Sequence, residues 1–337
     1  MDIIRLVQLF HPEHGRRVAV VKEPHLFLLH ENLKSVYSLA LEAINKREQI
    51  GEMINSNLST VSLDYTAIYE GSSSWVILPS FDHPENPFAC LVSGTGLTHK
   101  SSALNRQMMH QAKQEQLTDS MKMYQWGLEG GKPAEGNIGI QPEWFYKGNG
   151  SVIRAHGQTL ATPSYAEDGG EEPEIAGIYI VDKDGVPWRI GFSNGNEFSD
   201  HVMERKNYLY LAPSKLRQCA IGPELVIGLD FQSLEGTVRI IRNGQEIWSQ
   251  KINSGQSNMA HSLANLEHHH FKYESHRIPF QAHIHYFGAD AFSFGNQVEI
   301  QDGDKSEISW QHLGRPLVNT IAHASGENQL INVNELA

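Results

Sequence analysis

The stretch GGEEPEIAGIYIV, residues 169–181, joins three glutamates to an apolar, β-branched run. The run predicts a strand, and the interior of a sheet is an unfavourable place for carboxylates without partners. Because successive side chains of a strand point to opposite faces, Glu172 and Glu174 lie on the same face. The sequence therefore sets two negative charges side by side at the start of a largely apolar strand.

This carboxylate pair has three interpretations: a solvated edge, a salt-bridged surface pair, or two ligands of a hard cation such as Mg²⁺, Mn²⁺ or Ca²⁺. Downstream, the stretch IGFSNGNEFSDH contains a third acid, Glu197, where a turn can bring its carboxylate to the pair. Lys215 follows in the largely apolar stretch NYLYLAPSKLRQCAIGPEL. Three carboxylates and a lysine form a charge-balanced site that can hold a metal and an α-keto acid, with the ammonium group assisting proton movement.

Composition excludes several classes of protein. The 337 residues carry a formal net charge of −12 and show no lysine or arginine run, so we expect no nucleic-acid partner. No apolar run approaches the roughly 20 residues needed to cross a bilayer, so we expect no membrane association. The opening MDIIRLVQLFHPEHG has charges within its apolar part and no small-residue cleavage site, which argues against an export signal. Two cysteines, Cys90 and Cys219, form no disulfide framework and suit a reducing cytoplasm.

The chain divides by texture near residue 85, at the Pro- and Asp-rich loop FDHPENP. Before it, apolar residues at helical spacing over 33–53 lie between strand-like runs at 17–29 and 60–80. We therefore expect a small α/β domain over residues 1–85.

The remaining residues, 86–337, are predicted to form a second, β-rich domain. A helix is expected over 118–127, ending before the Gly- and Pro-rich stretch GLEGGKPAEGN. Beyond residue 140 the strand-like pieces are IAGIYIVD, PELVIGLD, GTVRIIRNGQEIWSQ and QVEIQDGDKSEISW. Asn243-Gly244 and Asp302-Gly303 suit tight turns. These features predict an antiparallel-rich, partly closed β structure.

Four motifs occur in an order that resembles the fumarylacetoacetate hydrolase superfamily, over roughly residues 86–322. They are EPEIA, GNEFSDH, APSKLRQCAIGPE and HYFGADAFSFGNQVEIQDGD followed by LGRPLVN. The resemblance implies an α+β fold with a twisted mixed β-roll catalytic domain, usually in homodimers. It also implies one Mg²⁺ or similar ion, whose ligands by position are Glu172, Glu174 and Glu197.

Within the superfamily the chain is similar to the 2-keto-3-deoxyarabinonate dehydratases. That likeness implies a metal-dependent dehydration of a 2-keto-3-deoxy sugar acid, which converts a pentonate to 2-oxoglutarate semialdehyde. We expect Lys215 or a metal-linked base to remove the C3 proton. Two alternatives stay open: hydrolysis of a C–C bond in a 2,4-diketo acid by water activated at His99, and a non-catalytic sugar-acid binding protein. Two positions depart from the pattern: Glu197 replaces the usual Asp, and Gly288-Ala289 replaces a Gly-Thr step.

Further candidate substrate contacts are Lys147, Ser199 and Tyr210. Lys147 lies in FYKGNGSVIRAHG, which resembles a segment that lines the site entrance, and either attracts the substrate carboxylate or is a surface lysine. Tyr210, like Tyr208, either contacts substrate hydroxyls or fills the core.

Two other motifs have weaker claims. GTGLTHKS, residues 94–101, nearly spells a phosphate-binding loop, but His99 replaces the required Gly and no clear strand-to-helix context is expected. His99 is then either a water-activating group or a loop histidine. EHHHFKYESH, residues 267–276, offers imidazoles for a transition metal, yet we expect a polar loop because adjacent histidines cannot all face one ion.

Overall fold

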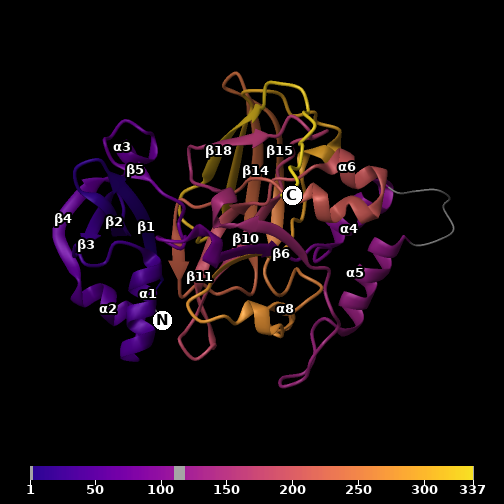
Figure 1. The fold of residues 1–337 in the computed structure, drawn as a ribbon. Coiled ribbons are helices and arrows are strands. Elements are labelled where there is room, and N and C mark those ends of the chain that lie inside the picture. Colours follow the sequence, from indigo (N-terminus) through magenta and orange to yellow (C-terminus); the bar gives the residue numbers. More distant parts are fainter. Residues whose placement is uncertain (1–2, 110–117, 337) are drawn as a thin grey trace.

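A computed structural model describes residues 3–109 and 118–336, and Figure 1 shows a smaller N-terminal unit beside a larger β-rich unit. The N-terminal unit packs two short helices against one face of a small sheet. Its elements are β1 (Ile4–His11), β2 (Gly15–Lys22), β3 (His25–Leu29), α1 (Val36–Lys46), α2 (Ile50–Ser56), β4 (Leu58–Asp64), α3 (Tyr65–Tyr69) and β5 (Val76–Ile77).

The helical pattern over 33–53 is confirmed but divides into two helices. Ser35 caps α1, since its hydroxyl accepts the backbone N–H of Ser38 at 3.0 Å. Arg47 ends α1 in the left-handed conformation, with φ of 55°. The predicted strand-like run at 60–80 divides into β4, which ends at Asp64, and the short β5; between them the side chain of Asp64 caps α3.

One large sheet extends through both units. Its main path runs β4-β3-β2-β1-β13-β11-β10-β16-β6-β7. The link between the units is the antiparallel pair of β1 and β13, with Ile4 opposite Ile227, so hydrogen bonding is continuous across the two parts. The strands contributed by the larger unit are β6 (Cys90–Gly94), β7 (Phe145–Asn149), β8 (Ile153–Arg154), β10 (Pro173–Val181), β11 (Pro187–Asn196), β12 (Cys219–Ile221), β13 (Leu225–Ile227) and β16 (Ala282–Tyr286).

A second sheet of five strands packs against the first. Its order is β15-β14-β17-β18-β9, and its bounds are β9 (Thr159–Thr162), β14 (Leu234–Arg242), β15 (Gln245–Ser254), β17 (Lys305–Trp310) and β18 (Leu317–His323). Ile175 and Phe192 from the first sheet share one buried core with Val238 and Ile308 from the second. The predicted turn in the β14–β15 hairpin is confirmed, because Asn243 and Gly244 have φ of 52° and 78°.

In the strand-like piece 297–310, the predicted turn at Asp302-Gly303 is present, with φ of 86° at Gly303, and only the part from Lys305 on forms a strand. Most ladders are antiparallel, while β16–β6, β12–β8 and β18–β9 are parallel. Both sheets together therefore form the mixed β structure of the predicted α+β fold.

Helices flank the larger unit in Figure 1, with α4, α5 and α6 on one side and α8 below the central strands. They are α4 (Lys100–Met109), α5 (Asp119–Gly130), α6 (His201–Lys206), α7 (Leu211–Ser214) and α8 (Leu263–Phe271). The helix predicted over 118–127 is confirmed, but it continues to Gly130. Gly127 lies inside this helix. A glycine is needed there because a Cβ would lie 2.7 Å from Nε2 of His261. Among the described helices, none is long and apolar enough to cross a membrane.

Candidate metal centre and active site

Three glutamates meet where β10 begins and β11 ends. Glu174 lies on β10 opposite Gly195, and the backbone N–H of Glu197 donates to the carbonyl of Glu172 at 3.0 Å. One oxygen from each carboxylate lies within 4.8 Å of those from the other two, and all three side chains are buried. The solvated-edge and surface-pair interpretations of Glu172 and Glu174 are therefore wrong.

Two lysines neutralise part of this cluster. Nζ of Lys215 lies 2.7 Å from Oε1 of Glu172 and 2.7 Å from Oε2 of Glu197. Nζ of Lys147 lies 2.7 Å from Oε1 of Glu197. Burial favours the neutral acid, but Lys215 and then His201 outweigh it and hold the pKa of Glu172 well below its usual range.

Glu174 differs from the other two carboxylates in what it contacts. Its Oε2 accepts the backbone N–H of Gly288 at 2.6 Å. Burial, followed by the charges of Glu197 and Glu172, raises the pKa of Glu174 well above its ordinary value. Burial also raises the pKa of Glu197, against the attraction of its lysines. A cluster of three buried carboxylates with this excess of negative charge fits a hard divalent cation.

Lys215 is the residue directly after α7. Its glutamate partners, Glu172 and Glu197, lie where β10 begins and β11 ends. Besides the two glutamates, Nζ of Lys215 donates to Oγ of Ser199 at 2.8 Å and lies 4.9 Å from the centre of the Phe145 ring. Oγ of Ser199 donates in turn to Oε2 of Glu197 at 3.1 Å. Ser199 therefore lies in the carboxylate cluster, bonded to the lysine and to one glutamate.

Lys147 on β7 is not a surface lysine. It is fully buried, and its Nζ donates to the backbone carbonyls of Glu197, at 3.0 Å, and Phe198. Burial lowers the pKa of Lys147, while the neighbouring Glu197 opposes that shift. These contacts fix the strand-to-loop turn that carries Glu197, so the lysine already has protein partners where a substrate carboxylate was expected.

The two tyrosines have different environments. Tyr210 is 47% exposed, so it does not fill the core. The hydroxyl of Tyr208 donates to Oε2 of Glu143, which is buried. Sequence reasoning missed Glu143; the available signal was alternation, since Glu143, Phe145 and Lys147 are buried while Tyr146 is exposed.

His99 lies in a buried loop between β6 and α4. A strand-to-helix context therefore exists there, contrary to our expectation, although the His99 side chain occupies the position where a phosphate-binding loop needs Gly. Nδ1 of His99 is 2.8 Å from Oγ1 of Thr98, while its buried Nε2 has no hydrogen-bond partner among the described residues. Burial lowers the pKa of His99 to about 4, so its imidazole is neutral at pH 7.

The segment 267–276 is not a polar loop. It continues α8 and ends in a 3₁₀ turn, with His270 and His276 buried against His283 and His285 of β16. Nε2 of His270 lies 3.0 Å from Nδ1 of His283.

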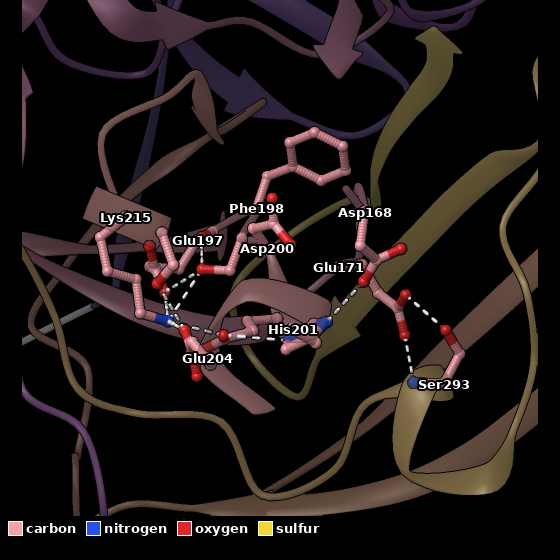
Figure 2. A network of polar contacts seen from close by, with 12 residues as sticks. Asp168, Glu171, Glu197, Phe198, Asp200, His201, Glu204, Lys215 and Ser293 are labelled. Carbon is pink, nitrogen blue, oxygen red and sulfur yellow. Dashed lines mark hydrogen bonds and ion pairs between the residues drawn. The ribbon is translucent and has the colours of Figure 1, made fainter. Parts of the chain in front are cut away.

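Sequence reasoning also missed the polar groups beside Glu197 and Lys215 that Figure 2 labels, among them His201, Asp168, Glu171 and Ser293. His201 lies between Glu172 and Asp168, and the carboxylate of Glu171 accepts the backbone N–H and the hydroxyl of Ser293 at 2.6 and 2.7 Å. Burial raises the pKa of Glu171 to about 7. Burial acts to lower the pKa of His201, but its contacts with Asp168 and Glu172 outweigh it and raise this pKa to about 10.

A second group of residues that could bind a metal lies on the β1–β2 hairpin, far in sequence from the glutamate triad. His11, Glu13 and His14 gather there on a largely exposed surface. Both ring nitrogens of His11 already have partners, Ser74 and the backbone N–H of Glu13. Within the described residues, the buried glutamate triad is therefore the better-built metal site.

No family model matches the chain. A 2-dehydro-3-deoxy-D-arabinonate dehydratase of Saccharolobus solfataricus is 30% identical over 122 residues, which are 35% of this chain and 40% of that protein. A Haloferax volcanii protein named "Probable 2-keto-3-deoxyxylonate dehydratase" is 31% identical over 121 residues, 34% of this chain and 40% of that protein. The matched region thus spans about two fifths of each curated relative.

Solved structures match over a greater length. A 2-keto-3-deoxy-D-arabinonate dehydratase complexed with magnesium and 2,5-dioxopentanoate matches 96% of this chain and 100% of its own, with a TM-score of 0.71 and 20% identity. That likeness establishes the fold. Together with the curated relatives, it confirms the resemblance to the fumarylacetoacetate hydrolase superfamily and its 2-keto-3-deoxyarabinonate dehydratase branch.

Proposed function

We propose that the protein is a metal-dependent dehydratase that removes water from a 2-keto-3-deoxy sugar acid. The observation that carries the proposal is the buried triad of Glu172, Glu174 and Glu197 with Nζ of Lys215 2.7 Å from two of its members. The two curated relatives, both named as sugar-acid dehydratases, support the reaction class. The relative solved with magnesium and 2,5-dioxopentanoate supports the metal and a five-carbon product.

The three glutamates would hold the ion, Mg²⁺ or else Mn²⁺ or Ca²⁺. When bound, such an ion supplies Lewis acidity that polarises a 2-keto group and acidifies the protons on C3. The residues of the chain then have two tasks: one group accepts a C3 proton, and another gives a proton to the C4 hydroxyl, which departs as water.

Lys215 is the candidate for proton transfer at C3. Between two carboxylates its amine is an ammonium group, so it accepts a proton only after passing one on. Glu197 is a suitable acceptor, because its Oε2 lies 2.7 Å away and burial raises its pKa. For the leaving hydroxyl, a candidate proton donor is the pair of Glu143 and Tyr208, joined at 3.0 Å.

A second candidate function is hydrolysis of a C–C bond in a 2,4-diketo acid. The buried Nε2 of His99, without a hydrogen-bond partner in the described part of the chain, favours it. A neutral imidazole with a free nitrogen can accept a proton from water, which such a hydrolysis requires. The dehydratase proposal keeps precedence because both curated relatives carry that name.

We further propose that the protein works in the cytoplasm as a homodimer, with a small 2-keto acid as its partner. The superfamily resemblance supports the dimer, and two buried free cysteines suit a reducing compartment. Light scattering coupled to size-exclusion chromatography measures the oligomeric state.

The activity is tested by incubating the purified protein with Mg²⁺ and a panel of 2-keto-3-deoxy and 2,4-diketo acids, with products identified by mass. Loss of one water that EDTA abolishes supports the dehydratase. Addition of water with release of two fragments supports the hydrolase instead. Ligand binding without turnover of any panel member contradicts both and favours a binding protein.

A further inference from the structure

A buried histidine joins the metal-ligand triad to an acid outside it. His201 is the first residue of α6 and is 1% exposed. Its Nε2 lies 3.1 Å from Oε1 of Glu172, and its Nδ1 lies 3.4 Å from Oδ2 of Asp168. Figure 2 shows the ring between the lysine-bound carboxylates and Asp168. Because carboxylates only accept, Nε2 donates to Glu172, while Nδ1 faces Asp168 at ion-pair distance without forming a hydrogen bond.

The surroundings of His201 hold the ring in one orientation. Phe292 stacks on it at 4.5 Å with an interplanar angle of 3°, and Phe294 lies 5.2 Å away. Gly170 makes room for the ring, since a Cβ at that position would lie 2.3 Å from Nδ1 of His201.

The backbone that carries His201 is also fixed. Asp200 caps α6 by accepting the N–H of Met203 at 2.8 Å, and Arg217 donates to Asp200 at 3.0 Å. A ring restrained by stacking and by its backbone offers its N–H groups in constant directions.

Oε1 of Glu172 therefore accepts from two directions. His201 approaches it at 3.1 Å and Lys215 at 2.7 Å. Two fixed donors on one oxygen restrict rotation of the carboxylate and thereby orient the whole group. Partners of this kind around ligating residues usually contribute about 10–100-fold to metal affinity.

We propose that the Asp168–His201 pair is a positioning device that orients Glu172 and so sets the affinity of the triad for its divalent cation. The inference rests on the proposed metal centre. His201 acts through Glu172 and has no direct role in the reaction, whereas Lys215, the other donor to the same oxygen, is the proposed proton-transfer group.

The test measures Mn²⁺ binding to the full-length protein without substrate, by the electron paramagnetic resonance signal of free Mn²⁺. His201→Leu keeps much of the bulk and removes both the donor to Glu172 and the contact with Asp168, so its dissociation constant should rise about 10–100-fold. His201→Gln retains an amide donor toward Glu172 and should recover most of the affinity. Asp168→Asn, which leaves the ring in place, should produce a smaller loss in the same direction.

His156→Leu is the matched control. His156 is also a packed histidine, stacked on Tyr69 at 4.1 Å and bonded to backbone, but it belongs to no part of the carboxylate cluster. Its Mn²⁺ affinity should equal that of the wild type.

Four results would overturn the inference: unchanged or tighter Mn²⁺ binding in His201→Leu, an equal loss in His201→Gln, no loss in Asp168→Asn, or an equal loss in the His156→Leu control. If His201→Leu fails to fold, the Asn variant decides alone: Asp168→Asn must lose Mn²⁺ affinity relative to the His156→Leu control, and no loss overturns the inference. A wild-type protein that binds no Mn²⁺ contradicts the metal centre itself, which is a separate failure.

Discussion

Lys215 and Glu197 form an ion pair of 2.7 Å inside a fully buried cluster. An ammonium group has three donors, and Lys215 directs them at Glu172, Glu197 and Ser199, at 2.7, 2.7 and 2.8 Å. Glu204 lies a little farther away, at 3.2 Å. Lys215 is thus held by the groups that the proposed reaction uses. Its two possible roles, proton transfer and neutralisation of the carboxylates, can be distinguished by experiment.

Lys215→Met keeps the aliphatic stem and removes the charge and the proton, so packing should survive better than with Ala. We expect substrate binding to be largely retained and kcat to fall by roughly 10²–10⁴, the usual effect of losing a positioned acid–base group. Rates measured across a Mg²⁺ titration distinguish the two possible roles. Recovery of the rate at high Mg²⁺ would mean that Lys215 only neutralises the carboxylates.

Lys147→Met is the matched comparison for that experiment. Lys147 is equally buried and also pairs with Glu197, but its other partners are backbone carbonyls. In the Lys147 variant the Mg²⁺ affinity should change, but kcat at saturating Mg²⁺ should equal that of the wild type. A kcat loss that high Mg²⁺ does not restore would place Lys147 in the chemistry.

Glu174→Gln tests the metal ligand whose pKa is raised by burial and then by the charges of Glu197 and Glu172. Because of this raised pKa the metal-free fold favours the neutral form of Glu174, and a neutral amide of similar shape should change the thermal midpoint little. A ligand that binds only the folded state raises the midpoint, and this increase with Mg²⁺ should disappear in the variant together with the activity. Calorimetry with and without Mg²⁺ measures both effects; unchanged turnover would contradict the assignment.

Local patterns were sufficient to predict some features. The strand after Glu174, the helix that begins after Thr118 and the Asn243-Gly244 turn depend on neighbouring residues, and each forms as expected. The carboxylates at 172 and 174 could be paired because strand periodicity fixes their face.

Features that depend on distant contacts could not be predicted. Lys147 is buried because its strand, β7, pairs with β6 and turns the side chain toward Glu197. The histidines of α8 show no apolar periodicity, and their burial comes from His283 and His285 on a strand that follows later in the chain. The His201–Glu172 contact likewise requires the completed β10–β11 hairpin.

Gly288→Ala probes the Gly288-Ala289 step, which stands where the resembled pattern has Gly-Thr. Gly288 has φ of +93°, and a Cβ there would lie 2.1 Å from Oγ1 of Thr98. Its N–H also donates to Glu174 at 2.6 Å. Strain in the left-handed region costs about 1–3 kcal/mol, and the clash adds to it, so the free energy of unfolding and the Mg²⁺ affinity should both decrease.

Gly157→Ala supplies the control for that variant. Gly157 has φ of +77° but no atom within 4 Å of the added Cβ, so it isolates the backbone cost. Denaturant unfolding should show a larger loss for the Gly288 variant. Equal losses, with Mg²⁺ affinity intact in both, would show that the Thr98–Gly288–Glu174 contact has no influence on the site.

The buried histidines predict that acid destabilises the fold. Burial lowers the pKa of His283 and His285 to about 3 from 6.5, and lowers that of His270 well below 6.5, with neighbouring histidines adding to the effect. In the unfolded chain these imidazoles take up protons near pH 6.5, whereas the folded protein keeps them neutral. Their contribution to stability is therefore complete above pH 6.5 and is lost progressively as the pH falls toward 3.

Urea unfolding at a series of pH values between 7 and 5 measures this loss. Well below pH 6.5, each such histidine lowers the free energy of unfolding by up to about 1.4 kcal/mol per pH unit. Glu171, with its pKa raised to about 7, acts in the opposite direction, because the folded state binds its proton first.

His285→Gln isolates one histidine: Gln can still bond to Ser93 and Thr95, the partners of His285 at 2.9 and 2.7 Å, but it does not titrate. The pH slope of this variant should be shallower by about one proton; a slope equal to that of the wild type would show that His285 is not held neutral by the fold.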